Sequence, residues 1–319
     1  MKTPRPLPGE LPFRPFTVAE ADAAGVSERR LRHGSLRSVG RGIRAPRTTA
    51  KVPLVARVRP FLEVNELCAA SHVTAAELHG LPHRRRRASD PEVYHVIRPE
   101  GAAHLNRPHV TVHRAKLFED EVSFAQGLPV TTPARTWLDL AETVSIDELV
   151  AVGDACVRIP YPDLEGRTDS HCTIADLRRI VDRHKGKRGI RKARIALELI
   201  RVGSDSPQET QLRLELVRAG LPEPRLNVQI VGPDGRRGPK PDIAFVDYRV
   251  GVEYEGEHHG EVQQVVRDIT RSESYADALW TEVRISKRHM LHNAKAAVAK
   301  VRTALVAAGW RPDSKTTAP

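Results

Sequence analysis

The chain of 319 residues is long enough for two or three domains, and its 40% hydrophobic residues can form packed cores. The net charge is +11, and no apolar run approaches the length that spans a bilayer. A disordered or membrane-spanning protein is therefore not expected. The three cysteines, Cys68, Cys156 and Cys172, lack metal-ligand or paired spacing, and the first residues lack the apolar core of a secretory signal. We expect a cytoplasmic protein.

Most of the excess positive charge lies at the start of the chain. Residues 1–60 contain 13 Lys/Arg against 4 Asp/Glu, whereas residues 61–203 and 204–319 each have a net charge of only +1. Such a basic segment is typical of proteins that bind a polyanion. The charge therefore favours nucleic acid as a partner, with an arginine-rich surface that serves only solubility as the alternative.

Residues 12–50 are expected to form two helices followed by a basic hairpin. Thr17 with Glu20 three residues later is a capping-box pattern, Gly25 ends this helix, and Ser27 caps the second. This order predicts a winged helix-turn-helix, whose second helix enters the major groove while the wing contacts the backbone. The expected nucleic-acid contacts are arginines of the second helix and the hairpin: Arg29, Arg30, Arg32, Arg37, Arg41 and Arg44.

This first segment resembles the N-terminal winged-helix domain of AbiEi-type antitoxins. The resemblance implies a DNA-binding protein that has a cognate toxin or another protein as a further partner. A helical protein-interaction domain is the alternative for the same short motifs.

Residues 51–203 are expected to form a mixed α/β connecting region. A short helix stops at Gly80, two alternating strands follow at "EVYHVIRP" and "HVTVHRAKL", and the second of two later helices begins at Ser145. His109 and His113 lie four apart on an expected strand, and we interpret them as ordinary strand residues rather than a metal pair. The segment resembles the body region that follows antitoxin-like winged helices, and no chemistry is assigned to it.

Residues 204–310 follow the pattern helix, strand, strand, strand, helix, strand, helix, with the first strand expected at "LNVQIV". In the third strand Glu253 and Glu255 alternate with Val252 and Tyr254, so the two carboxylates share one face. Antiparallel pairing brings Asp242 beside that face. Carboxylates on adjacent strands suit Mg²⁺ or Mn²⁺, which lowers the pKa of a bound water and stabilises charge on a phosphate.

These residues resemble the PD-(D/E)xK nuclease core, and "PDIAFVDYRVGVEYEGEHH" is most similar to the endonuclease-like domain related to very-short-patch repair enzymes. The resemblance implies a restriction-endonuclease-like mixed sheet flanked by helices, with Asp242, Glu253 and Glu255 as metal ligands. Glu255 stands where many family members carry the catalytic Lys. Lys240 is one expected substitute for this missing cation, and a histidine is the other. His259 is the expected general acid.

Two further assignments in this segment keep alternatives. Glu209 completes the metal shell in the nuclease interpretation, but it also stands at the third position of a helix capped by Ser206. Arg267 and Arg271, four apart on one helix, contact phosphate or simply form a solvated face.

The sequence as a whole thus predicts an α/β (α+β) protein that binds DNA and has a metal-dependent endonuclease domain. The alternative is a non-catalytic DNA-binding regulator of the antitoxin type, and a third reading is an RNA-directed nuclease.

Overall fold

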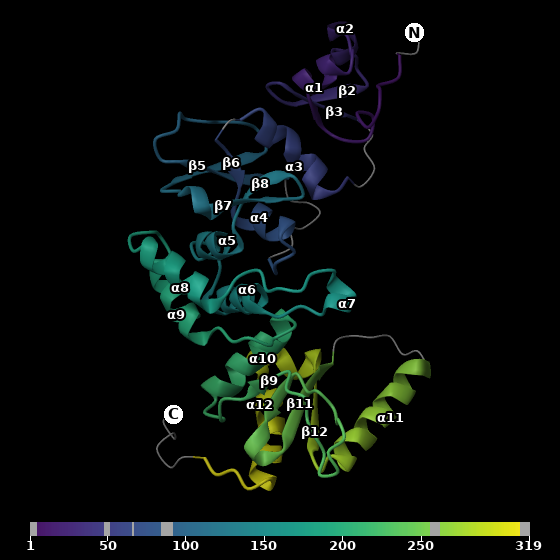
Figure 1. The fold of residues 1–319 in the computed structure, drawn as a ribbon, viewed down its shortest axis with the longest axis vertical. Coiled ribbons are helices and arrows are strands. Elements are labelled where there is room, and N and C mark those ends of the chain that lie inside the picture. The colour runs from purple at the N-terminus through teal and green to yellow at the C-terminus, as the bar shows by residue number, and fades with distance from the viewer. Residues whose placement is uncertain (1–4, 48–51, 66, 84–91, 256–261, 313–319) are drawn as a thin grey trace. The chain divides into compact units, whose positions relative to one another are not determined.

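The structure, a computed structural model, describes residues 5–47, 52–65, 67–83, 92–255 and 262–312, and for 262–269 it describes the backbone alone. The chain forms two compact units, each assembled from two chain segments (Figure 1). The first contains Met1–Val144 and Ala175–Ala193, and the second contains Ser145–Ile174 and Arg194–Pro319. Both units combine helices and strands, which confirms the mixed α/β class. Within the described ranges, no helix has the length and apolar character needed to cross a membrane.

The first unit contains two small sheets with the helices that pack on them. Its elements are β1 (Phe16–Thr17), α1 (Val18–Ala23), α2 (Glu28–Leu31), β2 (Leu36–Gly40), β3 (Ile43–Pro46), α3 (Leu54–Glu63), β4 (Ala69–Ala70), α4 (His72–Leu78), β5 (Tyr94–Pro99), β6 (Val110–Ala115), the 3-10 helix η1 (Glu119–Glu121), β7 (Val122–Ala125), β8 (Leu128–Thr131), α5 (Pro133–Leu140) and α8 (Ile174–Arg183). Helix α9 (Ile190–Leu199) begins in this unit and ends in the second.

The first helices begin where their capping residues predict. The Thr17 hydroxyl accepts the Glu20 N–H at 2.9 Å, and the Ser27 hydroxyl accepts the Arg30 N–H at 3.3 Å. Gly25 has a φ of +72°, the left-handed conformation that ends a helix at little steric cost. Strands β1, β3 and β2 form an antiparallel sheet in that order beside the two helices. The expected order of helix, helix and hairpin is therefore present, with α2 limited to four residues.

The larger sheet of this unit has the strand order β6-β5-β4-β8-β7. Strands β5 and β6 run parallel, with Tyr94 paired to Val110 and Pro99 to Ala115. Side chains of the hairpin, α3, α4 and this sheet share one apolar core, which includes Ile43, Phe61 and Val130. The hairpin and the sheet are therefore packed together through buried side chains.

The second unit has one four-stranded sheet between helices. Its elements are α6 (Ile146–Val157), α7 (Pro162–Glu165), α10 (Pro207–Arg218), β9 (Arg225–Leu226), β10 (Ile243–Phe245), the 3-10 helix η2 (Val246–Tyr248), β11 (Val250–Glu255), α11 (Val262–Asp277), β12 (Thr281–Ser286), the 3-10 helix η3 (Lys287–Met290) and α12 (Leu291–Ala307). The strand order is β12-β11-β10-β9, with β11 and β12 parallel and the other pairs antiparallel.

Different helices pack on the two faces of this sheet (Figure 1). On one face, apolar side chains of β10, β11 and β12 pack with those of α10 and α12, as Val252, Leu212 and Val301 do. On the other face lies α11, whose Tyr275 approaches Gly251 of β11. Acidic side chains of β11 that alternate with the core residues therefore face α11.

The first strand of this sheet is much shorter than expected. The sequence predicts a strand throughout "LNVQIV", but β9 contains only Arg225 and Leu226. Asn227 has a φ of +49°, which is incompatible with an extended strand, so the regular strand ends there although the Asn227 N–H still donates to the Asp242 carbonyl at 3.2 Å. The expected strand at this position is therefore wrong beyond its first residue.

Candidate functional site

The antiparallel pairing of β10 and β11 places Asp242 beside Glu253. Ile243 pairs with Val252, so Asp242, the residue before it, lies opposite the residue that follows Val252. The Tyr254 N–H donates to Asp242 Oδ2 at 2.7 Å, which fixes this carboxylate at the start of the strand. Val252 and Tyr254 pack toward the core on the other face. The period-two pattern of the sequence thus predicts the positions of these two acids correctly.

Gly251 lets α11 come close enough to reach this acidic pair. A Cβ at Gly251 would lie 2.7 Å from the Tyr275 ring, a separation that no side chain tolerates. Because the glycine leaves this space open, the Tyr275 hydroxyl reaches Glu253 Oε1 and donates to it at 2.8 Å. Burial and the Glu253 charge raise the pKa of Tyr275, so the hydroxyl stays a donor.

Burial raises the pKa of three carboxyl groups in this region, and the charge of Asp242 opposes the ionisation of the other two. Glu253 is 8% exposed, and burial together with the charge of Asp242 raises its pKa to about 7. Burial and Asp242 also raise the pKa of Glu209 to about 7. Asp242 itself has a raised pKa because it is removed from water, which the Tyr254 N–H partly offsets. A perturbed carboxyl cluster of this kind is typical of functional sites.

Glu209 serves as a helix cap in addition to this electrostatic coupling. The Ser206 hydroxyl accepts the Glu209 N–H at 3.2 Å and donates to Glu209 Oε1 at 2.8 Å. Glu209 Oε2 accepts the Asp205 N–H at 2.8 Å. The capping arrangement that the sequence left as an alternative is therefore present, and it holds the carboxyl group of Glu209 in place.

An open hollow of about 410 Å³ lies next to Glu253. Its lining includes the cationic side chains Lys240 and Arg271. The charge of Arg271 lowers the pKa of both Asp242 and Glu253, against the larger effect of burial. Lys240 Nζ donates to the Tyr161 hydroxyl at 2.9 Å, which places it at the rim. The hollow therefore combines two cations with a buried acid, an arrangement that suits a phosphate group.

Glu255 has a different partner from the other predicted ligands. Its Oε1 lies 3.3 Å from Arg284 Nη1 on the neighbouring strand β12. Among the described residues, Asp242, Glu253 and Glu255 do not bring three ligand oxygens within 4.8 Å of one another. A preformed three-carboxylate metal shell is thus absent from this part of the chain, and metal binding by these residues stays a prediction. His259 and the side chain of Arg267 lie outside the described residues.

The predicted nucleic-acid contacts form two groups. Arg29 of α2, Arg37 of β2 and Arg41 of the hairpin turn are exposed. The others make contacts within the unit: Arg32, although exposed, pairs with Glu28 at 2.9 Å, while the half-buried Arg30 donates to the Arg5 carbonyl at 2.8 Å and the half-buried Arg44 to the Ser38 hydroxyl at 3.3 Å. The exposed set is therefore the better candidate for contacts with a polyanion.

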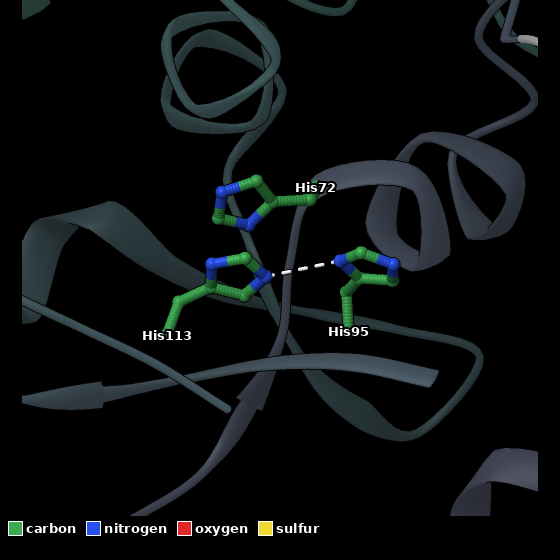
Figure 2. A group of neighbouring side chains, drawn as sticks. All are labelled: His72, His95 and His113. Atoms are coloured by element: carbon green, nitrogen blue, oxygen red, sulfur yellow. Dashed lines mark hydrogen bonds between the residues drawn. The ribbon is translucent and has the colours of Figure 1, made fainter. Parts of the chain in front are cut away.

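Two groups of side chains were not foreseen from the sequence. His113 lies near His72 and His95, not near His109, and these three offer ligand nitrogens within 4.8 Å of one another (Figure 2). The signal available was a histidine on each of two adjacent strands, but the pairing of the strands was needed to use it. Cys156 and Cys172 also lie close together, since the Cys172 N–H donates to the Cys156 carbonyl at 3.1 Å, and the Cys172 thiol together with burial raises the pKa of Cys156. The spacing of the cysteines in the sequence did not indicate that these two lie close together.

Comparisons with known proteins locate a family signal in the middle of the chain. The family model described as "AbiEi antitoxin C-terminal domain" matches residues 68–199. Two uncharacterized proteins of Mycobacterium tuberculosis, MT2308 of strain CDC 1551 / Oshkosh and Rv2248 of strain ATCC 25618 / H37Rv, are each 30% identical over 160 residues. These alignments cover 50% of this chain and 55% of each relative. The chain thus spans about half the length of the curated relatives it matches.

Among solved structures, the crystal structure of RV2827C protein from Mycobacterium tuberculosis matches with 18% identity and a TM-score of 0.38, covering 62% of this chain and 74% of that chain. So low a score carries no argument. The family match shows that residues 68–199 are similar to an antitoxin domain. It supports the AbiEi-like resemblance, and it does so in the segment expected to be the antitoxin body. The resemblance of residues 12–50 to the N-terminal domain of that family stays a prediction.

Proposed function

We propose that this protein is a DNA-binding regulator of the antitoxin type. The observation that carries the proposal is the match of residues 68–199 to the AbiEi antitoxin C-terminal domain. The basic start of the chain supports the proposal, because a regulator that binds DNA needs a positively charged surface. Arg29, Arg37 and Arg41 are exposed on α2 and the hairpin and can provide it. A protein toxin is the further partner that the family description suggests.

Removing charge from the hairpin tests the DNA-binding surface. The double variant Arg37→Ser/Arg41→Ser removes two exposed arginines, and each phosphate contact contributes about 0.9 to the slope of log K against log salt. We expect the slope to fall by about 2 and the affinity near 0.1 M salt to fall on the order of 10- to 100-fold. Titration of a labelled duplex by fluorescence anisotropy at several salt concentrations measures both quantities.

A matched control separates this surface from net charge alone. Arg178 of α8 and Arg191 of α9 are also exposed in the first unit, so Arg178→Ser/Arg191→Ser removes the same charge elsewhere. If the control double variant weakens binding as much as the hairpin variant, the hairpin is not the DNA-binding surface. If neither variant changes the slope, the regulator does not bind DNA through this segment.

A second candidate function is metal-dependent hydrolysis of a phosphodiester. The observation that favours it is the acidic group of Glu209, Asp242 and Glu253 beside a hollow lined by Lys240 and Arg271. A bound Mg²⁺ or Mn²⁺ would supply an activated water and neutralise charge on the phosphate. Asp242 and Glu253 would hold the cation, the Tyr275 hydroxyl would orient Glu253, and Arg271 would bind the phosphate.

Cleavage of supercoiled plasmid decides between the two functions. Wild type and Asp242→Asn are compared with Mg²⁺ or Mn²⁺, with EDTA as the metal-free control and matched RNA duplexes as the second substrate. Metal-dependent nicking that disappears in Asp242→Asn establishes the hydrolase. Absence of cleavage by wild type, with salt-dependent DNA binding unchanged in Asp242→Asn, leaves the regulator alone.

A further inference from the structure

Three histidines from different elements converge in the first unit, whereas the acidic site belongs to the second. His72 is the first residue of α4, His95 lies on β5 and His113 lies on β6. His95 Nδ1 and His113 Nε2 are 3.0 Å apart, and the His72 ring stacks on the His113 ring with centroids 3.5 Å apart (Figure 2). One potential ligand atom from each ring lies within 4.8 Å of the other two.

Backbone pairing, and not side-chain flexibility, brings these histidines together. On the parallel strands β5 and β6, Ile97 pairs with His113, so His95, two residues earlier, shares the face of His113. The start of α4 is tied to the same strand, because the Ser71 N–H donates to the His95 carbonyl at 3.0 Å. The His95 N–H in turn donates to the Thr74 hydroxyl at 2.8 Å. One main-chain hydrogen bond and one bond from the His95 main chain to a side chain therefore hold His72 over the strand pair.

The surroundings keep all three imidazoles uncharged. His72 is 3% exposed, and its removal from water lowers its pKa to about 3. Burial likewise lowers the pKa of His113 to about 4 and the pKa of His95 below its usual value. The charge of Asp139 raises the pKa of His72 and His113 and so opposes the effect of burial. The charge of Lys187 lowers both pKa values further. Neutral imidazole is the form that offers a lone pair to a metal ion.

His72 shows two features that an ordinary core histidine does not need. Its φ is +50°, a left-handed conformation that is strained for a residue with a Cβ and is typically retained where a side chain has to be aimed. Its Nδ1 lies 3.0 Å from the Ser71 hydroxyl, which leaves Nε2 as the ring nitrogen for another partner. A hydrogen-bond partner on the second nitrogen is what metal-binding histidines usually have.

We propose that His72, His95 and His113 form a binding site for one divalent transition-metal ion, with Zn²⁺ as the best fit. Zn–N bonds of about 2.0–2.1 Å at tetrahedral angles place two ligand nitrogens about 3.3 Å apart, close to the 3.0 Å between His95 and His113. The stacked His72 and His113 rings turn about their side-chain bonds so that both lone pairs meet the ion. Three neutral imidazoles favour Zn²⁺, Cu²⁺ or Ni²⁺ over Mg²⁺, which prefers oxygen. The fourth position is taken by water or an added ligand.

Cobalt and zinc titrations of the untagged, chelator-treated full chain test the site. We expect one equivalent of Co²⁺ to give the intense visible absorption of a tetrahedral nitrogen-rich site, and one equivalent of Zn²⁺ to displace it. His95→Gln and His113→Asn each remove a ligand, so zinc affinity measured by calorimetry falls about 100-fold or more. Ser71→Ala keeps the three ligands and lowers the affinity about 10- to 100-fold, the usual effect of losing an outer partner.

Two variants serve as controls. His109→Asn changes an exposed histidine four residues before His113 and leaves zinc binding as in wild type. Asp242→Asn removes an acid that the second candidate function assigns to a cation, so zinc uptake at one equivalent that survives in this variant belongs to the histidines. The proposal is overturned if wild type takes up no zinc at one equivalent, if the zinc affinity of His95→Gln and His113→Asn equals that of wild type, or if Asp242→Asn abolishes binding. Far-UV circular dichroism of the metal-free variants shows that any loss is not unfolding.

Discussion

Replacing Glu253 with glutamine is expected to stabilise the second unit at alkaline pH. Glu253 is 8% exposed, and its pKa is raised from 4.5 to about 7. The folded state therefore keeps a proton on this carboxyl group up to about pH 7, while the unfolded state releases it near pH 4.5. Because the folded state binds more protons in this interval, wild-type stability falls as the pH rises from 4.5 to about 7. Glutamine is neutral throughout and avoids this loss.

The size of the effect follows from the shift in pKa. At 1.36 kcal/mol for each pH unit, the whole interval corresponds to about 3 kcal/mol, and partial hydration of the site reduces this to about 1–3 kcal/mol. The Tyr275 hydroxyl donates to Glu253 Oε1, and the amide oxygen of glutamine accepts the same hydrogen bond. We therefore expect Glu253→Gln to match wild type near pH 4.5 and to exceed it by that amount at pH 8.

The stability of the second unit at both pH values is measured by urea unfolding in the presence of EDTA. Hydrogen exchange of peptides from β10 and β11 follows the unfolding. Glu255→Gln is the matched control, because Glu255 lies on the same strand but is partly exposed and paired with Arg284. A variant that is less stable than wild type at pH 8, or a difference that does not change with pH, would refute the assignment of a buried, charge-opposed carboxyl group at Glu253.

Two substitutions test the packing that supports this site. Asp154→Ala leaves the buried Arg213 without its nearer carboxylate, while Glu223 remains at 3.9 Å; since the Asp154 and Arg213 side chains are both 1% exposed, we expect a loss of about 3–5 kcal/mol in urea unfolding of the second unit. Asp147→Ala removes the more exposed pair between the same two helices, with Arg218, and is expected to change stability by less than about 1 kcal/mol. Gly251→Ala forces a Cβ against the Tyr275 ring and is expected to lower stability by about 1–3 kcal/mol in the same assay, whereas Gly101→Ala meets open space and should have little effect.

Local patterns predicted a substantial part of the fold. Helix starts at Thr17, Ser27 and Ser145 follow from a side-chain oxygen that accepts a nearby N–H, an interaction contained within four residues. The period of two in β11 likewise fixed which face carries Glu253. These features were accessible because each depends on residues adjacent in the chain or on a single pair of neighbouring strands.

Features that depend on tertiary pairing were not accessible. The histidine group requires β5 and β6 to run parallel and the start of α4 to bind β5, and no local pattern encodes either condition. The shortening of β9 depends on the left-handed conformation of Asn227, and a single asparagine, although typical of turns, did not outweigh the alternating pattern around it. The ion pair of Glu255 with Arg284 was missed because it joins β11 to a strand that follows a whole helix.

The segment Ser145–Ile174 has a practical consequence for work on fragments of this protein. This segment belongs to the second unit. The chain then returns to the first unit for Ala175–Ala193 and completes the second unit with Arg194–Pro319. A fragment that begins at residue 204, the boundary suggested by the change of sequence pattern, omits α6 and with it Asp154, while it retains Arg213. Such a fragment would expose an apolar face of α10 to water and leave the Arg213 guanidinium without the Asp154 carboxylate. To express the second unit by itself, residues 145–174 have to be joined to residues 194–319, by a fusion or by circular permutation.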